Sequence, residues 1–333
     1  AQKAIERAGT NDFDIDEDPG DGNGVTVVCG TQNYGYIDKF IDVTVNISST
    51  TRTSFAQLLF PDALVNRVDA ITRVRPRMPL AFGHAIVALN TDACSGNQNG
   101  VVFGGNGDTH INGGGIWSNG CLRGNGSSYD AVVENGGVNY VGETDGTMNF
   151  QPEETQVPYT LPPSSFEIDM PNCSDPDAHN VNNLPNTLSP GLWCVNGDVR
   201  LNANDDVTGD GVTIVVLNGD VVVNGSSSVH LGAPEQDPDP SPAVGGLLFY
   251  VPNGNVTING GSEQWYQGLI YAPGNPAPFS GGDCKVDGGS EMGWTINTQI
   301  VCWNVEVTGN ATIDINFNAG QEYQKPTSIE LYR

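Results

Sequence analysis

The sequence predicts a mainly β protein, in which a parallel β-helix or β-solenoid follows a small N-terminal α+β region. Three observations predict this class. Helix signals end near residue 80, beyond which short β-rich runs alternate with Gly and Asn turns. One phrase of about seven residues recurs in that part of the chain. Six of the 7 cysteines also fall into closely spaced pairs.

The acidic composition excludes several classes of function. The 333 residues include 39 Asp and Glu against 13 Lys and Arg, for a net charge of −26. Such a surface repels nucleic acid and anionic lipid headgroups. No run reaches the ~18 apolar residues of a membrane helix, and no signal peptide is visible. We therefore expect no nucleic-acid partner and no membrane span in this chain, with any export or anchor segment upstream of Ala1.

Residues 1–80 are predicted to form the α+β region. Residues 1–9 have the pattern of the last turns of a helix, closed by a glycine. Short β-rich runs predict strands at 25–28 and 65–74, and the alternation of apolar and polar residues predicts one at 40–47. Residues 54–60 are predicted to form a short helix.

Residues 81–320 are predicted to form the solenoid. The phrase Asn-Gly-Asp/Asn, two variable residues, an aliphatic residue and Asn occurs at 106–112, 196–202, 218–224 and 253–259. An irregular repeat without helices predicts strands stacked on those of the previous turn, with Gly and Asn at the corners. At such repeat lengths we expect roughly ten turns and a rod of about 50 Å.

Three segments of the chain interrupt or follow this pattern. Residues 143–190 have little strand signal and are expected to wrap the outside of the rod or to form a large excursion. The proline-rich residues 233–243 are predicted to form a loop at one corner, and residues 321–333 a C-terminal strand.

Cysteine spacing predicts an oxidising compartment, and hence an extracellular or cell-surface protein. We expect the disulfides Cys94–Cys121, Cys173–Cys194 and Cys284–Cys302, and for Cys29 a partner in a segment upstream of the chain. Asn-x-Ser/Thr sequons permit glycans at six positions. They are Asn46, Asn125, Asn172, Asn224, Asn255 and Asn310.

Calcium is the one cofactor that the sequence suggests, although no cofactor is required. Asp206, Thr208 and Asp210 resemble the start of a calcium loop, but Thr208 replaces an acidic or amide ligand and the twelfth position lacks Glu. The alternative is a polar turn. Asp14, Asp16 and Asp18 alternate and could chelate a cation, and the alternative there is a solvated acidic loop.

The sequence does not predict an enzyme. Asp108, Asp198 and Asp220 occupy one place in the repeated phrase, which indicates a corner role in which each side chain bonds its own backbone. The four histidines are scattered, and nothing resembles a catalytic triad.

Aromatic residues suggest carbohydrate binding without catalysis. Their side chains would form a stacking surface for sugars, and the alternative is that they cap or line the interior of the solenoid. They are Trp117, Trp265, Trp294, Trp303, Tyr266 and Tyr271.

Basic residues cluster once, at Arg67, Arg73, Arg75 and Arg77. One hypothesis is that this cluster mediates self-assembly by docking on an acidic face of another copy or of another part of the chain. The alternative is a row of solvated strand residues.

The N-terminal region resembles the TadE/TadG-like proteins of the Flp, or tight-adherence, pilus system. The resembling segments are the helix at 1–9, the strands at 25–28 and 40–47, the helix Ser54-Phe55-Ala56-Gln57-Leu58-Leu59-Phe60 and the Arg- and Val-rich strand at 68–74. They cover about the first quarter of the chain, and the rest resembles repeat-bearing extensions. The resemblance implies an exported, envelope-associated protein of a pilus or surface appendage, with the family's membrane helix upstream.

We therefore expect an extracellular structural protein, a pilus-associated or filament-forming surface subunit that assembles head-to-tail. Its partners would be further copies or other pilus and envelope proteins, and residues 1–80 or the last strand, 328–332, would cap or dock. The alternatives are a secreted carbohydrate-active or carbohydrate-binding β-helix and a calcium-dependent adhesin.

Overall fold

The structure is a computed structural model that divides the chain into two compact units. The N-terminal sheet unit comprises Ala1–Met78 and Pro326–Arg333, and the parallel-sheet unit comprises Pro79–Lys325. The predicted mainly β class with parallel sheets is confirmed. The structure describes residues 2–10, 23–33, 37–51, 64–92, 94, 100–125, 130–146, 149–161, 165–236, 242–261, 263–276, 279–289 and 294–332.

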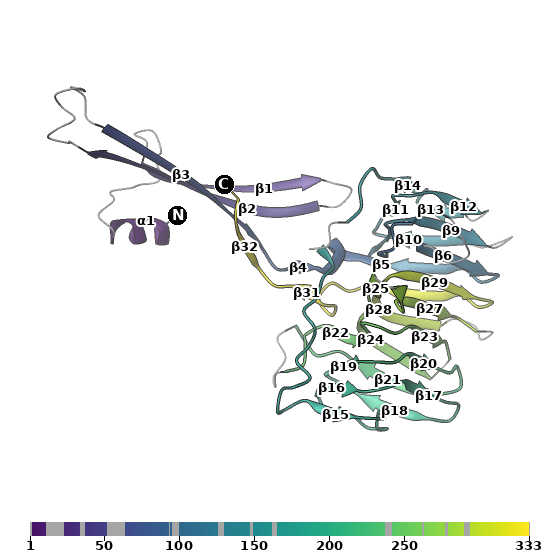
Figure 1. The fold of residues 1–333 in the computed structure, drawn as a ribbon. Coiled ribbons are helices and arrows are strands. Elements are labelled where there is room, and N and C mark those ends of the chain that lie inside the picture. Colours follow the sequence, from purple (N-terminus) through teal and green to yellow (C-terminus); the bar gives the residue numbers. More distant parts are fainter. Residues whose placement is uncertain are drawn as a thin grey trace. The chain divides into compact units, whose positions relative to one another are not determined.

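The N-terminal sheet unit is a four-stranded antiparallel sheet with the strand order β1-β2-β3-β32 (Figure 1). Its described elements are α1 (Gln2–Gly9), β1 (Gly24–Asn33), β2 (Ile37–Thr51), β3 (Leu64–Arg75) and β32 (Ser328–Leu331). The expected α+β, pilin-like character is not seen, because the one helix described here has 8 residues. The strands are longer than predicted because the antiparallel pairing continues through polar residues beyond the predicted ends, at 31–33 of β1 and 48–51 of β2. The helix expected at 54–60 lies outside the described residues.

The last strand, which we expected to cap or dock, already has a partner. Strand β32 pairs antiparallel with β3, with Glu330 opposite Arg73 and Ile329 opposite Val74. Its edge next to β3 is therefore occupied within its own unit.

The parallel-sheet unit contains three ladders of parallel strands, drawn as stacked arrows in Figure 1. The first is an eight-stranded sheet in the order β12 (Thr144–Gly146), β9 (Cys121–Asn125), β6 (Gly100–Gly105), β29 (Asn304–Gly309), β27 (Asp283–Asp287), β23 (Val256–Asn259), β20 (Val221–Val223) and β17 (Val199–Leu201).

The other two ladders share the long strands β28 (Trp294–Cys302) and β24 (Gln264–Ala272). The second ladder adds β14 (Thr155–Gln156), β11 (Val138–Tyr140), β8 (Gly115–Ser118), β5 (His84–Ala88), β22 (Leu247–Tyr250), β19 (Val212–Val216), β16 (Gly191–Val195) and β15 (His179–Val181). The third adds β13 (Asn149–Gln151), β10 (Asp130–Glu134), β7 (Thr109–Asn112), β30 (Ile313–Asn316), β21 (Ser228–Gly232) and β18 (Asp206–Gly209). Short elements of the unit are η3 (Leu80–Gly83), β25 (Asn275–Pro276), β26 (Phe279–Ser280) and β31 (Gln324–Lys325), and β4 (Met78–Pro79) lies at the boundary of the two units.

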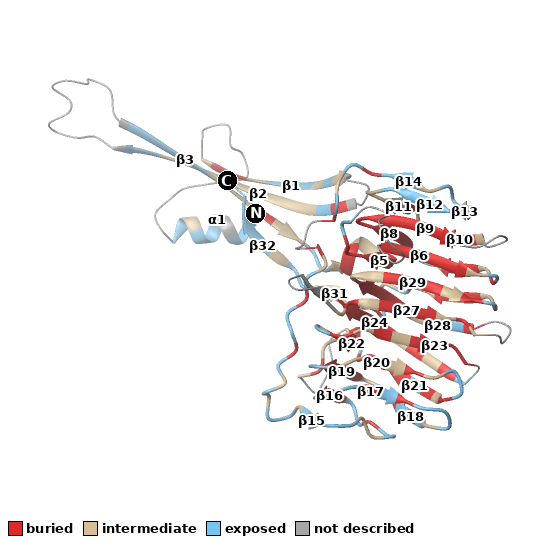
Figure 2. Cartoon of the chain, turned by 45° about the vertical axis from the view of Figure 1, so that its right-hand side comes forward, coloured by how far each residue is buried: buried red, intermediate tan, exposed pale blue. Residues whose placement is uncertain are grey.

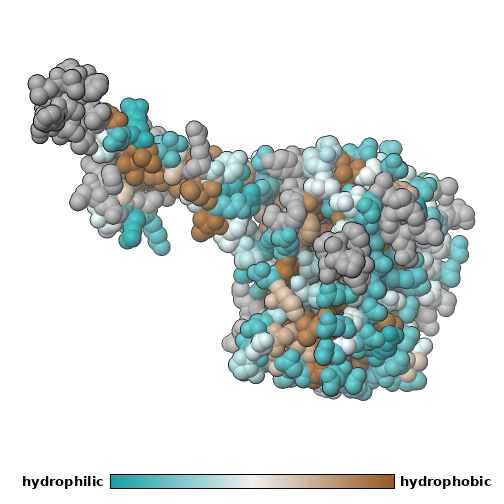
Figure 3. Space-filling model, in the orientation of Figure 1, coloured by the Kyte–Doolittle hydropathy of each residue, from teal (hydrophilic) through white to brown (hydrophobic). Residues whose placement is uncertain are grey.

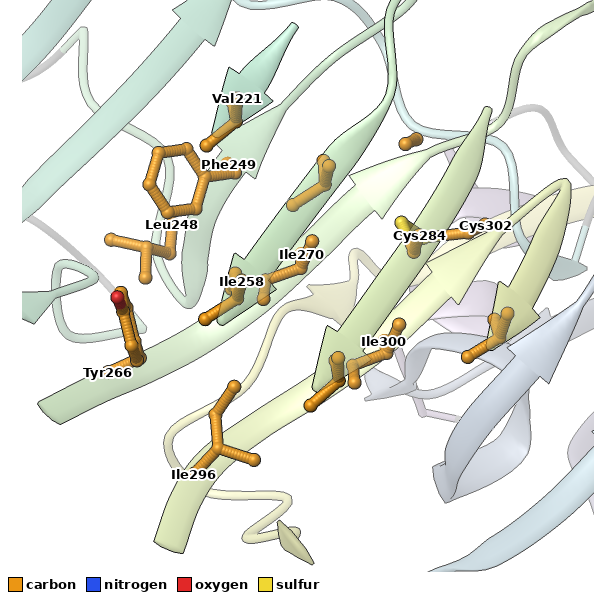
Figure 4. Packing of buried hydrophobic residues seen from close by; sticks show 14 of the residues in the cluster. Val221, Leu248, Phe249, Ile258, Tyr266, Ile270, Cys284, Ile296, Ile300 and Cys302 are labelled. Carbon is orange, nitrogen blue, oxygen red and sulfur yellow. A yellow bond between two sulfur atoms is a disulfide. The ribbon is translucent and has the colours of Figure 1, made fainter. Parts of the chain in front are cut away.

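Aliphatic and aromatic side chains from the three ladders pack into one continuous core (Figures 2 and 4). Because side chains alternate along a strand, each strand directs every second residue inward. In the eight-stranded sheet one register row of inward residues is Val221, Val256, Cys284, Val305 and Val101, all at most 2% exposed. In the copies at 218–224 and 253–259 this row holds the fourth position of the phrase, which we took as variable. The repeated aliphatic position adds Ile111, Leu201, Val223 and Ile258 to the core.

Strands from the beginning and the end of the parallel-sheet unit are neighbours. Strand β29 pairs with β6, and β30 with β7, so that Val305 lies opposite Val101 although 204 residues separate them. The ends of the ladders are consequently built from internal segments of the chain, β12 to β14 at one end and β15, β17 and β18 at the other.

The excursion expected at 143–190 is shorter in the structure. Residues 144–156 supply β12, β13 and β14, and β15 begins at His179. The described residues between them contain no strand, and they contact the second ladder, where the N–H of Leu161 donates to Asn119 Oδ1 and Cys173 is bonded to Cys194 of β16. The described part of the first ladder has eight strands, where we expected roughly ten turns.

Candidate functional site

The outer face of the eight-stranded sheet carries a register row in which five of eight side chains are charged, one position along each strand from the core row. Strand register aligns the members of this row directly next to one another. In ladder order they are Asp145, Arg123, Val102, Glu306, Lys285, Thr257, Val222 and Arg200. The row contains three of the four Lys and Arg residues between 79 and 325.

Each basic residue of the row has an acidic partner. Lys285 Nζ lies 3.1 Å from Glu306 Oε1, and Arg123 Nη2 lies 3.2 Å from Asp145 Oδ2. Arg200 Nη2 lies 2.8 Å from Asp198 Oδ2. Each cation of the row is therefore paired with a carboxylate, and the row is not a cationic strip for a polyanion.

A shallow cavity of about 220 Å³ lies around Lys285 and Glu306, and Asn255, Asp283 and Asn304 line its rim. Asn304 Nδ2 donates to Asp283 Oδ1 at 2.7 Å, and the N–H of Asp283 donates to Asn255 Oδ1 at 3.1 Å. The cavity offers amide, carboxylate and ammonium groups to a small polar ligand. Since its polar groups are bonded to one another, it resembles a binding surface more than a set of poised catalytic groups.

The repeated Asp residues bond to the backbone at neighbouring strands of the ladders, not to their own backbone as expected. Asp198 Oδ1 accepts the N–H of Asp220 at 3.0 Å, and Asp220 Oδ1 accepts the N–H of Asn255 at 2.8 Å. Asp108 Oδ1 likewise accepts the N–H of Asp130. The bond from Asp220 and the Arg200 guanidinium lower the pKa of Asp198, which suits an ionised acceptor and not a catalytic acid.

The asparagines of the phrase form a second set of bonds between neighbouring strands of the ladders. Asn218 Nδ2 donates to Asn196 Oδ1, and Asn106 Nδ2 donates to Asn310 Oδ1. Asn112 Nδ2 donates to Asn316 Oδ1 at 2.8 Å. The phrase therefore recurs because its polar positions bond from layer to layer while its aliphatic position fills the core.

The predicted calcium ligands at 206–210 lie on and just after a strand. Asp206 and Thr208 belong to β18 and are exposed, and Asp210 Oδ1 lies 3.4 Å from His230 Nε2. In the described part of the chain, no group of three or more His, Cys, Asp or Glu residues is arranged to hold a metal ion. Asp14, Asp16 and Asp18 lie outside the described residues.

The aromatic residues proposed for sugar stacking divide into two groups. Trp117, Trp294, Tyr266 and Tyr271 are buried. Trp265 and Trp303 are partly exposed, and the Trp265 ring stacks on His230 with centroids 4.2 Å apart and an interplanar angle of 15°. Of the six side chains, the buried four follow the alternative interpretation and Trp265 remains the best candidate for sugar contact.

The arginine cluster meets acidic residues inside its own sheet. Arg73 forms two hydrogen bonds with Asp42, at 2.8 and 2.9 Å, and its guanidinium lies between the rings of Phe40 and Tyr332. Arg73 lowers the pKa of Asp42 through this bond. Arg75 pairs with Asp38 and Glu330. Two of the four arginines are thus engaged within the sheet, whereas Arg67 is exposed on β3.

The structure contains the disulfides Cys94–Cys121, Cys173–Cys194 and Cys284–Cys302, the same pairs that the spacing predicts. Cys284 and Cys302 join two ladders inside the core (Figure 4). Cys29 is an exposed free thiol. The three disulfides are consistent with an extracellular protein.

The six sequons differ in accessibility. Asn125, Asn172 and Asn310 are exposed, whereas Asn46, Asn224 and Asn255 are half-buried. Asn224 Nδ2, the atom that would carry a glycan, donates to the carbonyl of Leu201.

The sequence interpretation missed two surfaces, the charged row and an exposed apolar face on the N-terminal sheet. The row depends on strand register across loops of unequal length, which no local pattern predicts. The apolar face had a visible signal, because residues 41–47 alternate apolar and polar side chains.

The chain matches no protein-family model and no curated protein. Among the described residues, no helix has the length and apolar content needed to cross a membrane.

Proposed function

We propose that this chain is an extracellular structural protein, a TadE/TadG-like pilus-associated or filament-forming surface subunit. In this proposal the three ladders form a β-solenoid that joins further copies or other pilus and envelope proteins head-to-tail. The solenoid interpretation is supported by the continuous core and by the Asn and Asp bonds between layers.

The observation that carries the proposal is a pair of strand edges. The eight-stranded sheet begins with β12 and ends with β17, and each is three residues long and has one neighbour among the described strands. Because all strands of this sheet run parallel, a translation along the ladder places β12 of one copy beside β17 of the next. Such a contact is open and continues into a fibre.

Electron microscopy of the native protein tests the proposal. With ~4.8 Å between strands, eight strands predict filaments with a subunit repeat of about 38 Å along the axis. Single particles at every concentration would overturn the head-to-tail contact.

A matched pair of variants locates the contact. The carbonyl of Glu143 accepts a bond from Leu122 of β9, so in a parallel ladder the N–H of the next residue, Thr144, faces the open edge. Thr144→Pro removes that donor and is expected to abolish filaments, whereas Thr144→Val keeps it and is expected to preserve them. If the two variants behaved equally, the contact between copies would not use the β12 edge.

Carbohydrate binding is the second candidate, favoured by the Trp265–His230 stack beside the exposed Asp210. A partly exposed indole with a neighbouring carboxylate is a common way to hold a sugar ring. Titration of oligosaccharides against tryptophan fluorescence tests this candidate, with Trp265→Ala expected to abolish binding and Trp303→Ala to preserve it.

A further inference from the structure

One face of the N-terminal sheet is mainly apolar in its central part, with polar side chains toward the strand ends. In an antiparallel pair, residues directly opposite each other point to the same side. The register places Val25, Val27 and Cys29 of β1 opposite Val45, Val43 and Ile41 of β2. The same face, which we call the apolar face, continues with Ile47 on β2, Val68, Ala70, Thr72 and Val74 on β3, and Ile329 and Leu331 on β32.

The charges of the sheet lie on the other face. Asp38, Asp42, Arg73, Arg75 and Glu330 alternate with the apolar set and bond to one another. Among the described residues of the apolar face, the register leaves one charged side chain, Lys39 opposite Thr31, and no acidic one.

The apolar face is open to solvent over much of its area. Val68 is 64% exposed, and Ile329 and Leu331 are 72% and 77% exposed. Figure 3 shows hydrophobic residues on the surface of this unit. Since an antiparallel sheet with one apolar face is stable when that face packs against another layer, the face indicates a missing partner.

Cys29 identifies the partner more closely. It lies on the apolar face and is an exposed thiol, whereas the other six of the 7 cysteines are in disulfides. An odd cysteine in an otherwise oxidised chain is typical of an intermolecular disulfide. A second copy of the same chain supplies an identical cysteine on an identical face, as a two-fold interface requires.

We propose that two copies of the chain pack apolar face to apolar face and that Cys29 of one copy forms a disulfide with Cys29 of the other. The two thiols lose two protons and two electrons to a disulfide oxidant such as oxidised glutathione, which becomes two thiols. Disulfides between facing sheets are known from sandwich folds. This contact is separate from the head-to-tail contact of the proposed function.

Area favours a second copy, and the lack of acidic side chains on the described apolar face permits one. Two chains of net charge −26 repel each other, and the apolar face lets them meet without bringing carboxylates together. Four strands spaced ~4.8 Å apart, over seven residues at ~3.4 Å each, give about 450 Å² of projected area per copy. Two copies approach the ~1,000 Å² of a weak biological interface, which is the range in which a covalent link adds most.

The neighbouring residues Val27 and Val28 provide a matched test, because they lie on opposite faces of β1 and are 43% and 54% exposed. In sedimentation of the full chain under reducing conditions, Val27→Asp buries an unpaired carboxylate and is expected to weaken dimerisation more than ~10-fold. Val28→Asp faces solvent and is expected to change it less than ~2-fold. On non-reducing gels with oxidised glutathione, a dimer band is expected that Cys29→Ser abolishes.

Each outcome decides the proposal. A monomeric wild-type chain, or equal effects of the two aspartate variants, overturns the apolar-face contact. A dimer in which Cys29 stays a thiol under oxidised glutathione overturns the covalent link. If Val27→Asp forms filaments as well as the wild-type chain does, the head-to-tail contact is independent of the apolar-face contact. A dimer that depends on Val27, in a protein that forms no filaments, supports the apolar-face contact and overturns the head-to-tail contact.

Discussion

In the parallel-sheet unit the apolar side chains are inside, whereas in the N-terminal sheet unit several are outside and some charged ones are inside. Asp38 and Arg73 are 6% and 7% exposed, less than most valines of the same sheet. Phe249, Ile270 and Ile300 of the parallel-sheet unit are at most 1% exposed. The parallel-sheet unit completes its core with its own strands, whereas the N-terminal sheet unit leaves one side of its sheet for a partner. The comparison separates a unit whose core is complete from a unit with an apolar sheet face exposed to solvent.

The largest effect is expected from opening the core of the parallel-sheet unit. Phe249→Ala removes a fully buried ring and is expected to lower the free energy of unfolding by about 3–5 kcal/mol. Val68→Ala on the apolar face is expected to change it by less than about 0.5 kcal/mol in the reduced monomer. Denaturant unfolding of each unit measures both, and a costly Val68→Ala would show that the apolar face is already packed.

Removal of a core disulfide comes next. Cys284 and Cys302 are 18 residues apart and join two ladders, so replacing both with Ala is expected to cost about 3 kcal/mol through the entropy of the unfolded chain. Cys29→Ser in the N-terminal sheet unit is the control and is expected to leave monomer stability unchanged. Calorimetric melting compares them, and equal melting temperatures would contradict the division between the two units.

A buried histidine gives the parallel-sheet unit a pH dependence. Burial lowers the pKa of His84 to about 4 from its usual 6.5, so the unfolded chain binds a proton that the folded chain does not. Stability is complete above pH 6.5 and falls by about 3 kcal/mol as the pH decreases to 4. In His84→Gln this part of the slope should vanish, whereas His110→Gln, at a half-exposed histidine, should retain it. Identical slopes in both variants would place the titration elsewhere.

The charged interior of the N-terminal sheet unit predicts a smaller and local effect. Arg73→Met loses two hydrogen bonds to Asp42 and the contacts with Phe40 and Tyr332, an expected cost of about 2 kcal/mol. Arg67→Met, on the same strand and face, is the control. Hydrogen exchange at the Tyr332 amide, which donates to Ile71, reports whether β32 loosens. Unchanged exchange would mean that the apolar side holds β32.

The repeated phrase and the cysteine spacing predicted parallel layers and the three disulfides, because both signals are local to one turn of the chain. The pairing of β6 with β29 could not be predicted, since no local pattern brings together residues 204 apart. For the same reason the sequence did not predict that Arg75 pairs with Glu330. The apolar face was within reach of the sequence, because residues 41–47 alternate along one strand, but its exposure depends on what packs against it.

The smallest effect concerns the bonds that make the repeat. Asp220 Oδ1 accepts the N–H of Asn255, and Asp220→Ala leaves that donor without its acceptor, at an expected cost of about 1 kcal/mol. Asp220→Asn keeps an oxygen at the same position and is expected to be nearly neutral, as the natural Asn255 suggests, whose Oδ1 accepts the N–H of Asp283. Denaturant unfolding measures both variants. If Asp220→Asn were as costly as Asp220→Ala, the carboxylate charge and not the layer-to-layer bond would explain why Asp recurs. The acidic surface would then have to be counted among the functional features of the parallel-sheet unit.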